Sequence, residues 1–354
     1  MSAQPTDTRV YYALALDPIH VGAGGYRLGE VDLSIVREPG TNLPKIPGTS
    51  LEGCARAYNA IAAGSYSKPE FDTTTGELNE VKSCADKGGA DGAGHCGEIN
   101  CPVCVTYGFA IGPQNRSFQG MAQFYDARIL FFPVHSLAGP VWVTSEQALA
   151  DAGYSLPQKQ SVSGHQVRTA AGLVKCPAQH GQQAAPQKRR WGLNLGWLFL
   201  DIAGDDLEVD TIWQKLPNMS SVDRLDTIKS RLVLVPDALF SLVVNSNLEA
   251  RTSVSIDPRT GAAEDKALFT YEALPRATVL SFTVICQNPQ NYAFPELAAD
   301  GKRVTYKPFG NDQHAVWVRT NVESGLRLME HLGVGGMGTR GFGRLRILNL
   351  AGGA

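Results

Sequence analysis

The pattern of apolar and polar positions along the chain predicts a mixed α and β protein. Some stretches alternate apolar residues with small or polar ones, as a half-buried strand does, and others repeat them every three or four positions, as one face of a helix does. The predicted strands are residues 9–17, 31–36, 122–132, 141–144, 191–202, 232–235, 279–286 and 344–350. The predicted helices are residues 48–63, 145–152, 222–230, 237–244 and 321–332. Because strands and helices do not alternate strictly, their order favours an α+β fold over a doubly wound parallel sheet.

Polar residues mark the expected helix starts and the places where the pattern breaks. Ser145, Asp237 and Asn321 are expected to cap their helices. Residues 64–100 show no regular pattern and are rich in glycine, aspartate, serine and threonine, so we interpret them as an insertion. Residues 157–190 are polar, contain many glutamines and end in a basic run, which predicts a mobile loop.

Composition narrows the class of protein. The chain has 354 residues, of which 43% are hydrophobic and 19% charged, as expected for a globular core. No apolar run approaches the roughly 18 residues that a membrane helix needs. The first nine residues lack the apolar core of a secretory signal. We therefore expect a cytoplasmic protein with no membrane partner, and the net charge of −2 is compatible with a local basic groove.

A glycine-rich turn and a helix start near the N-terminus predict an anion site. Residues 22–25 contain three glycines, and such turns expose backbone N–H groups. Thr49 and Glu52 fit a capping box, with Thr49 as the N-cap of the helix at 48–63. A helix N-terminus attracts anions, and Lys45 adds a positive charge beside it. This segment therefore suits a phosphate ligand.

Asp32 is the candidate catalytic residue beside this turn. A single carboxylate can act as a base or anchor a metal ion in the cleavage of a phosphodiester. The structural alternative is an ordinary acid that caps a turn at a strand end, and Glu30 and Glu38 are nearby acids that compete for the role. His20 is more simply explained as a packing histidine than as a catalytic one.

A second glycine-rich loop, residues 333–343, precedes the last predicted strand. Its Gly336, Gly338 and Gly341 have the spacing of a dinucleotide fingerprint, but that motif lies between a strand and a following helix, and here the order is helix, loop, strand. Backbone N–H groups together with Arg340 and Arg344 would bind a phosphate chain without reading bases. The alternative is a flexible turn.

Four of the seven cysteines lie within a short part of the insertion. Cys101 and Cys104 form a C-x₂-C pair, and Cys84 and Cys96 lie upstream in a glycine-rich stretch. An odd number of cysteines in a chain of this length argues against a disulfide framework. We predict a closed structural zinc site with these four ligands, in which His95 could replace Cys84 or Cys96. A redox pair, or reduced cysteines with no ligand, are the alternatives.

A β-hairpin is predicted from alternating residues 251–257 and 267–272, joined by a turn at 258–261. It contains arginines and aromatic residues, namely Arg251, Arg259, Phe269 and Tyr271. A projecting arm of this kind can wedge between stacked bases. It could equally pack on its own domain or on a neighbouring subunit.

Taken together, these motifs resemble the RAMP superfamily. The matching segments are His20-Val-Gly-Ala-Gly24, Gly29-Glu-Val-Asp32, Arg37-Glu38, Pro44-Lys-Ile-Pro-Gly-Thr-Ser-Leu-Glu-Gly53, Thr260-Gly-Ala-Ala-Glu264, Ala267-Leu-Phe-Thr-Tyr-Glu-Ala-Leu-Pro275 and Gly335-Gly-Met-Gly-Thr-Arg-Gly-Phe-Gly343. Within that superfamily they are similar to the repeated backbone subunit of type III CRISPR RNA-guided effectors, closer to the Cmr than to the Csm kind. Residues from about 140 to 230 match nothing that we can name.

The resemblance implies a fold and a domain division. It implies one RAMP domain over residues 1–354, with a ferredoxin-like, RRM-type palm, a zinc-binding cysteine-rich insertion at 64–106 and a thumb hairpin at 249–277. Several copies would stack along a CRISPR RNA together with other effector subunits. Each thumb would kink the duplex of guide and target RNA.

The resemblance also implies an activity and a set of site residues. The subunit would cleave target RNA at regular intervals, with Asp32 at the cleavage site, Mg²⁺ or Mn²⁺ as the catalytic ion and the neighbouring 2′-hydroxyl as the attacking group. Cys84, Cys96, Cys101 and Cys104 would bind structural Zn²⁺. The RNA-binding candidates are His20, Lys45, Ser50, Arg56, Arg251, Phe269, Gly336, Gly338, Arg340 and Arg344.

Three other functions stay open at this stage. The chain could be a non-catalytic scaffold subunit of the same kind of complex, which predicts no loss of cleavage on substitution of Asp32. It could be a solitary zinc-bound RNA-binding protein that needs no guide. It could also be a guide-processing ribonuclease with a metal-free, histidine-centred site that uses His20 or His135.

Overall fold

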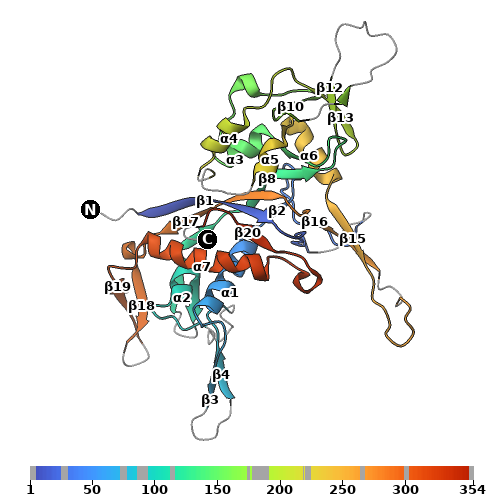
Figure 1. Cartoon of the computed structure of the whole chain (residues 1–354). Helices are drawn as coiled ribbons and strands as arrows, with labels where there is room; N and C mark the ends of the chain where they lie inside the picture. Colours follow the sequence, from blue (N-terminus) through green and yellow to red (C-terminus); the bar gives the residue numbers. More distant parts are fainter. Residues whose placement is uncertain are drawn as a thin grey trace.

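The computed structural model describes residues 5–24, 31–71, 78–85, 95–111, 116–173, 176–177, 191–217, 219, 225–263, 268–298 and 303–350. The fold is mixed α+β, as predicted, and is built on one large sheet with helices on both sides (Figure 1).

The strands and helices have the following bounds. The strands are β1 (Thr6–Ala15), β2 (Lys45–Ile46), β3 (Lys68–Phe71), β4 (Leu78–Lys82), β5 (Gly108–Ile111), β6 (Arg116–Gln119), β7 (Ala122–Phe124), β8 (Ala127–Val134), β9 (Val141–Thr144), β10 (Gln166–Thr169), β11 (Cys176–Pro177), β12 (Trp191–Leu195), β13 (Leu198–Ile202), β14 (Leu232–Leu234), β15 (Glu249–Ser253), β16 (Phe269–Ala273), β17 (Val279–Gln287), β18 (Ala293–Leu297), β19 (Val304–Pro308) and β20 (Leu345–Ile347). The helices are α1 (Gly48–Ala62), α2 (Pro102–Tyr107), α3 (Glu146–Asp151), α4 (Val209–Lys215), α5 (Asp226–Ser230), α6 (Asp237–Ser246) and α7 (Ala315–Leu332).

The large sheet has the strand order β11-β12-β13-β10-β14-β9-β8-β17-β1-β20, with β2 and β7 paired beside this path. Its second half, β8-β17-β1-β20, is antiparallel at every step. The first half includes two parallel pairs, β10 with β13 and β14 with β9. The sheet therefore joins an antiparallel half, made from both ends of the chain, to a mixed half made from its middle.

Alternation along β1 sends neighbouring tyrosines to opposite faces of the sheet, because successive side chains in a strand point to opposite sides. Tyr11 stacks on Phe282 with ring centres 5.5 Å apart and donates a hydrogen bond to Glu323 of α7. Tyr12 belongs to the hydrophobic cluster of the other face, which also contains Phe131 and Trp213. Both tyrosines are fully buried, so the sheet is covered on both sides here.

Helices α1 and α7 pack together on one face of the antiparallel half (Figure 1). Their contact requires a residue without a side chain, because a Cβ atom on Gly325 of α7 would lie 2.2 Å from the carbonyl oxygen of Ala55 in α1. The opposite face is covered by the cluster that includes residues of α3, α4 and α5. The face that carries α1 and α7 thus supports the late glycine-rich loop, which follows α7 directly.

Most of the predicted strands form, and three differ in detail. Residues 31–36 form no regular strand, and Leu33 and Ile35 instead make isolated bridges to Tyr271 and Gly22. The stretch 122–132 is divided into β7 and β8, and the stretch 191–202 is the hairpin β12–β13. In that hairpin Gly196 has a φ of +59°, which a glycine adopts without strain.

The predicted helix caps were less accurate than the helices. Ser145 caps α3 as expected, by accepting a hydrogen bond from the N–H of Ala148. The capping box of Thr49 is wrong, because Pro47 is the N-cap of α1 and no side chain of that segment bonds to it. Asn321 is also wrong as a cap, since α7 begins earlier and is capped by His314.

Asp237 likewise does not cap its own helix. The N-cap of α6 is Pro236, and the carboxylate of Asp237 accepts a hydrogen bond of 2.9 Å from the N–H of Gln147 in α3. A second correction concerns residues 157–190, because a mobile loop was expected where β10 lies inside the large sheet. A short polar strand of this kind is stabilised by its neighbours and leaves little hydrophobic pattern in the sequence.

Three hairpins project from this body, namely β3–β4, β15–β16 and β18–β19 (Figure 1). The hairpin β15–β16 is the one predicted from the alternation at 251–257 and 267–272. Its strands pair from Glu249 with Ala273 to Ser253 with Phe269, and Ile256 and Ala263 bridge further out. The turn at 257–261 is closed by a hydrogen bond from Gly261 to Asp257.

Candidate nucleic-acid interface and metal centre

Asp32 lies at the base of the hairpin β15–β16. Its Oδ2 atom accepts a hydrogen bond of 2.7 Å from the backbone N–H of Thr270, and its side chain is exposed. The next residue, Leu33, is held by two backbone hydrogen bonds to β16, from its N–H to Thr270 and from the N–H of Glu272 to its carbonyl. The candidate carboxylate is therefore fixed against the hairpin and faces solvent.

The late glycine loop packs against the segment that begins at His20. The N–H of Gly336 donates to the carbonyl oxygen of His20 at 2.9 Å. Gly335 has a φ of +85°, and a Cβ atom there would lie 2.3 Å from that same oxygen. Gly338 has open space around its Cα atom and is exposed. Some of these glycines are thus required by packing, whereas Gly338 lies on the open side of the loop.

Two arginines and two phenylalanines connect this loop to the hairpin. The guanidinium of Arg340, on the loop, lies 5.3 Å from the ring centre of Phe269 on β16. The guanidinium of Arg251, on β15, lies 5.0 Å from the ring centre of Phe342 on the loop. Tyr271 packs edge-on against Phe342 at 5.2 Å. The loop and the hairpin base therefore form one surface with two cations on aromatic rings.

His20 is enclosed at the centre of this arrangement. Only 5% of the residue is exposed, and its Nδ1 atom is hydrogen-bonded to the carbonyl oxygen of Glu272 at 2.6 Å. Its ring also meets Tyr271 edge-on at 6.1 Å. These contacts fit a packing histidine that connects the first glycine turn, the hairpin and the late glycine loop.

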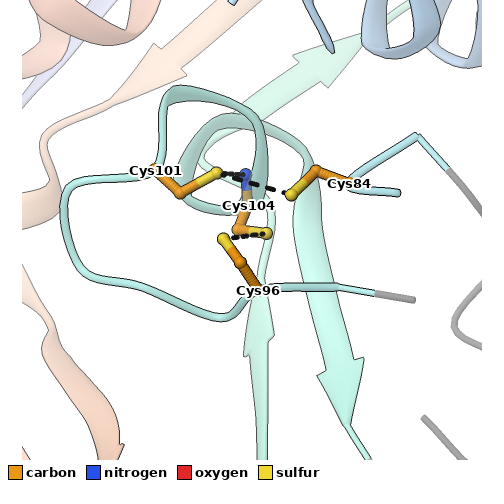
Figure 2. Close-up of side chains that lie close together, drawn as sticks. All are labelled: Cys84, Cys96, Cys101 and Cys104. Carbon is orange, nitrogen blue, oxygen red and sulfur yellow. Dashed lines mark hydrogen bonds between the residues drawn. The ribbon is translucent and has the colours of Figure 1, made fainter. Parts of the chain in front are cut away.

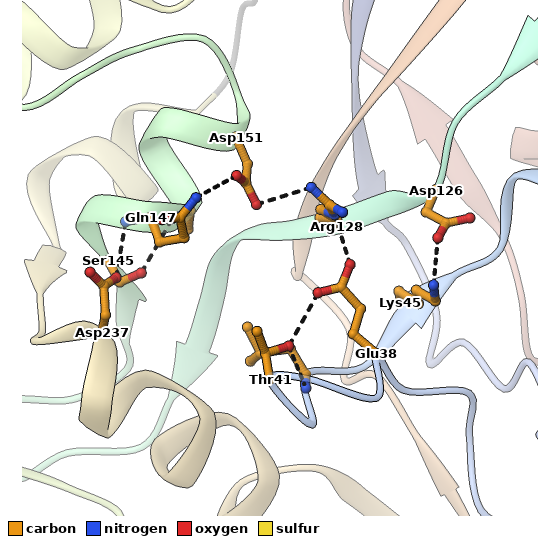
Figure 3. Close-up of polar contacts among 11 residues, drawn as sticks. Glu38, Thr41, Lys45, Asp126, Arg128, Ser145, Gln147, Asp151 and Asp237 are labelled. Atoms are coloured by element: carbon orange, nitrogen blue, oxygen red, sulfur yellow. Dashed lines mark hydrogen bonds and ion pairs between the residues drawn. The ribbon is translucent and has the colours of Figure 1, made fainter.

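The predicted anion site at the start of α1 is occupied by the carboxylate of Asp126, whose contact with Lys45 is drawn in Figure 3. Asp126 accepts hydrogen bonds from the N–H of Gly48 at 2.8 Å and from Lys45 at 2.5 Å. Burial by itself raises the pKa of Asp126, but the bonds from Lys45 and Gly48 outweigh it and hold the pKa below its ordinary value. Ser50 is half-buried in the same turn, and its N–H donates to Pro47.

The competing acid Glu38 belongs to a separate ion-pair network (Figure 3). Arg128 of β8 bonds to Glu38 at 2.8 Å and to Asp151 at 3.2 Å. Clefts of about 410 and 270 Å³ both border Arg128 and Asp151. Glu38 therefore has a salt-bridge partner away from Asp32, and Glu30 lies outside the described residues.

Arg344, at the end of the late glycine loop, pairs with Asp17.

The four cysteines of the insertion converge, as predicted (Figure 2). Their sulfur atoms all lie within 4.8 Å of one another, with 3.7 Å between Cys96 and Cys104 and 3.8 Å between Cys84 and Cys101. A tetrahedral zinc ion with Zn–S bonds of about 2.3 Å requires sulfur atoms about 3.8 Å apart. The donor set and its spacing therefore fit a closed tetrahedral thiolate site.

The helix cap at Cys101 and the hydrogen bonds among the thiols support a thiolate metal site. The Sγ atom of Cys101 accepts a hydrogen bond from the N–H of Cys104 and so caps α2. Hydrogen bonding with Cys101 lowers the pKa of the Cys84 thiol and raises the pKa of the Cys104 thiol. The crowded sulfur atoms would therefore share protons in the absence of a cation, and a bound cation would stabilise all of them as thiolates.

Arg56 and His95 lie next to this cluster and outside it. The guanidinium of Arg56, on α1, donates to the carbonyl oxygens of Cys84 at 2.9 Å and Tyr107 at 3.3 Å. Its third contact is His95 Nε2 at 2.8 Å. The structure thus places the RNA-binding candidate Arg56 at the cysteine cluster, and it does not group His95 with the four sulfur atoms.

Two charged residues near Asp32 were missed by the sequence analysis. Arg37 and Glu272 form an ion pair of 2.9 Å at the hairpin base, with 10% and 18% of their side chains exposed. The motifs that contain them were noted, but the two residues are 235 positions apart, and nothing in either motif indicates that they are in contact.

In the described part of the chain, no helix is long and apolar enough to cross a membrane.

Comparisons of the sequence with a protein-family model and with known proteins both give a match over most of the chain. The model of the RAMP superfamily matches residues 13–346. The CRISPR system Cmr endoribonuclease Cmr4 of Pyrococcus furiosus is 25% identical over 279 residues, which cover 78% of this chain and 80% of that protein.

Solved structures share the fold at lower identity. A crystal structure of Cmr4 has a TM-score of 0.53 at 18% identity, over 97% of this chain and 100% of that chain. The cryo-EM structure of the Type III-B Cmr-beta bound to cognate target RNA has a TM-score of 0.57 at 14% identity, over 97% of both chains. Oligomeric Cmr4 from Pyrococcus furiosus has a TM-score of 0.51 at 20% identity, over 98% of this chain and 100% of that chain. Since the family model spans nearly the whole sequence, the chain belongs to the RAMP superfamily.

Proposed function

We propose that this chain is the CRISPR-RNA-binding backbone subunit of a Cmr-type effector complex and cleaves complementary target RNA at regular intervals. Its family and its curated relative, a Cmr endoribonuclease, support this function. The observation that carries it is the position of Asp32, exposed at the base of a projecting hairpin and fixed by a hydrogen bond to Thr270. A carboxylate beside an arginine-rich and aromatic surface suits the cleavage of an RNA strand held there.

We propose a domain division that the strand order supports. The order β8-β17-β1-β20, with α1 and α7 on one face, matches the strand order expected of a ferredoxin-like palm, and we assign the palm to these elements. We assign residues 249–277 as the thumb and residues 64–106 as the cysteine-rich insertion of a single RAMP domain, residues 1–354. Strands β9 to β14 extend the same sheet beyond the palm.

RNA would lie across the joint surface of the thumb base and the late glycine loop. Arg251, Arg340 and Phe269 offer cations and an aromatic edge there, and Gly336 and Gly338 allow a backbone strand to approach closely. Arg344 lies at the end of the same loop. Lys45 and Ser50 would meet the guide near the start of α1, whereas His20 and Arg56 would support the site from within.

The chemistry proposed for Asp32 is proton transfer. The 2′-oxygen of a target nucleotide attacks the adjacent phosphorus, and the bond from phosphorus to the 5′-oxygen of the next nucleotide breaks. Asp32 accepts the proton of the 2′-hydroxyl, and the departing 5′-oxygen takes a proton from water. The products are a 2′,3′-cyclic phosphate and a 5′-hydroxyl end.

A divalent ion, Mg²⁺ or Mn²⁺, would neutralise the charge that develops on the phosphate. In the described residues the four cysteines are the one group of three or more potential metal ligands, so Asp32 offers such an ion a single carboxylate. The other ligands would have to be phosphate oxygens of the RNA and water. The cysteine cluster fits Zn²⁺, which in a closed four-thiolate site would stabilise the insertion and take no part in cleavage.

A non-catalytic scaffold subunit is the second candidate function. The single carboxylate favours it, because among the described residues no group of further potential metal ligands lies with Asp32, and this acid could serve only to cap the hairpin base. In both functions the chain would bind guide RNA in the cytoplasm, in a filament with further copies of itself and other effector subunits.

The test is target cleavage by the reconstituted, guide-loaded complex. Asp32→Asn keeps the size of the side chain and an oxygen for the Thr270 N–H, and Asp151→Asn is a control at the remote Arg128 network. We expect regularly spaced cuts with wild type and the control, and loss of cutting with unchanged RNA binding for Asp32→Asn. Cutting that persists in Asp32→Asn would move the chemistry elsewhere, and binding without cutting in wild type would establish the scaffold.

A further inference from the structure

Arg37 connects three segments that are distant in the sequence. Its Nη2 atom donates to Glu272 Oε1 of the hairpin at 2.9 Å, and its Nε atom donates to Asn245 Oδ1 of α6 at 3.0 Å. The Nη1 atom donates to the carbonyl oxygen of Ile35 in its own segment at 3.2 Å. Each of the three guanidinium nitrogens is thus used, and 10% of the side chain is exposed.

Glu272 extends this clamp toward Asp32. Its second carboxylate oxygen accepts a hydrogen bond of 3.3 Å from the N–H of Ile35, and its backbone N–H donates to Leu33. The residue adjacent to Leu33 is Asp32, whose carboxylate is bound by Thr270 of the same strand. The segment that carries Asp32 is therefore attached to β16 at Asp32, Leu33 and Ile35, and the ion pair with Arg37 fixes its far end.

The geometry requires arginine rather than any cation. A planar guanidinium donates in several fixed directions, so Arg37 can bind a carboxylate, an amide oxygen and a backbone carbonyl at once. Lysine would keep the charge opposite Glu272 but could not hold the contact with Asn245 in the same geometry. A shift of about 1 Å in a reacting group can lower a rate about 100-fold.

We propose that Arg37 is a positioning residue for the cleavage reaction, which it supports by fixing the Asp32 segment between the thumb base and α6. This inference rests on the proposed function of Asp32. It assigns Arg37 no contact with RNA, because its side chain is engaged within the protein. Its removal should therefore change the rate of cutting and leave the affinity for guide and target unchanged.

The experiment compares Arg37→Lys and Arg37→Gln in the guide-loaded complex, with Arg128→Lys as the matched control. Arg128 also bridges two partners, Glu38 and Asp151, but does so in the network away from Asp32. Single-turnover cleavage is measured against target concentration, and guide binding and thermal unfolding are measured on the same preparations. Asn245→Ala removes one acceptor of Arg37 without removing a charge, and it serves as the test if the Arg37 variants fail to fold.

We expect the maximal cleavage rate to fall about 10-fold to 100-fold in Arg37→Gln and less in Arg37→Lys, with the half-saturating target concentration unchanged. Asn245→Ala should lower the rate by a few fold, and Arg128→Lys should not lower it. Equal rates in all variants would overturn the role of Arg37 and leave the proposed function of Asp32 unaffected. A loss of cutting that appears only as weaker RNA binding would have the same consequence. A wild-type complex that binds target and leaves it uncut would overturn the proposed function, and the role of Arg37 with it.

Discussion

The guanidinium of Arg340 lies 5.3 Å from the ring centre of Phe269, so a loop at the end of the chain is held against a hairpin from an earlier part of it. Arg251 makes the reciprocal contact with Phe342 at 5.0 Å. A cation above an aromatic face still presents its N–H edge to solvent, which allows the same arginine to bind a phosphate. The hairpin base and the loop are therefore coupled before any RNA is bound.

We predict that this coupling is measurable in the RNA-free protein. A double-mutant cycle with Arg340→Ala and Phe269→Leu should give an interaction energy of about 0.5–1 kcal/mol in unfolding by urea, the range of exposed cation–π pairs. Arg259→Ala with Phe269→Leu is the control, because Arg259 lies in the distal turn of the hairpin and pairs with Asp257. Additive effects for Arg340 and Phe269 would contradict the coupling.

Substitution by alanine should destabilise the protein at Gly335 of the late loop but not at Gly338. Gly335→Ala should lower the free energy of unfolding by about 2 kcal/mol or more, because Gly335 has a positive φ and a Cβ atom would collide with the His20 carbonyl. Gly338→Ala should leave stability nearly unchanged, since no atom lies within 4 Å of the position that its methyl group would take. If RNA crosses this loop as proposed, Gly338→Ala should weaken guide binding. Urea unfolding and guide titration of both variants measure these effects, and a destabilised Gly338→Ala would contradict the assignment.

How far the sequence predicted the site depends on how local each feature is. The cysteine cluster was predictable because a C-x₂-C pair and its upstream partners lie in one short insertion. The environment of Asp32 was not, because its partner Thr270 is 238 positions away and only the pairing with β16 brings them together. The patterns at 31–36 and 267–272 predict extended segments, but they do not say which segments pair over so long a distance.

The start of α1 shows how tertiary structure can replace a local cap. Thr49 and Glu52 satisfy the sequence rule for a capping box, yet Asp126, from the bend between β7 and β8, binds the Gly48 N–H instead. The same carboxylate pairs with Lys45, and the strand expected at 122–132 is interrupted between Phe124 and Ala127. A local rule therefore found the helix but assigned its cap to the wrong group.

Asp126 should make stability depend on pH. Its folded pKa lies below the ordinary value of about 3.9, so its contribution is complete above that value and is lost as the pH falls through the folded pKa. Asp126→Asn should thus lower the free energy of unfolding at pH 7, by up to about 1 kcal/mol for this partly exposed pair, and the difference from wild type should shrink as the pH falls below about 4. Asp205→Asn, with 89% of the side chain exposed in wild type, is the control. A difference from wild type that stays constant between these pH values would contradict the role of the carboxylate.

Zinc should be bound by the cysteine cluster, and its release should affect α1. We expect about one zinc per chain by elemental analysis of wild type and of Cys54→Ser, whose thiol lies outside the cluster, and none in Cys104→Ser. Acid or a chelator should release the metal, because thiolates are the ligands and protons compete for them. Since Arg56 of α1 binds the carbonyl of Cys84, release should increase hydrogen exchange in α1 as well as in the insertion, while guide binding is partly kept. A folded wild-type preparation without zinc would contradict the site, and zinc release that leaves exchange in α1 unchanged would show that Arg56 does not connect the two.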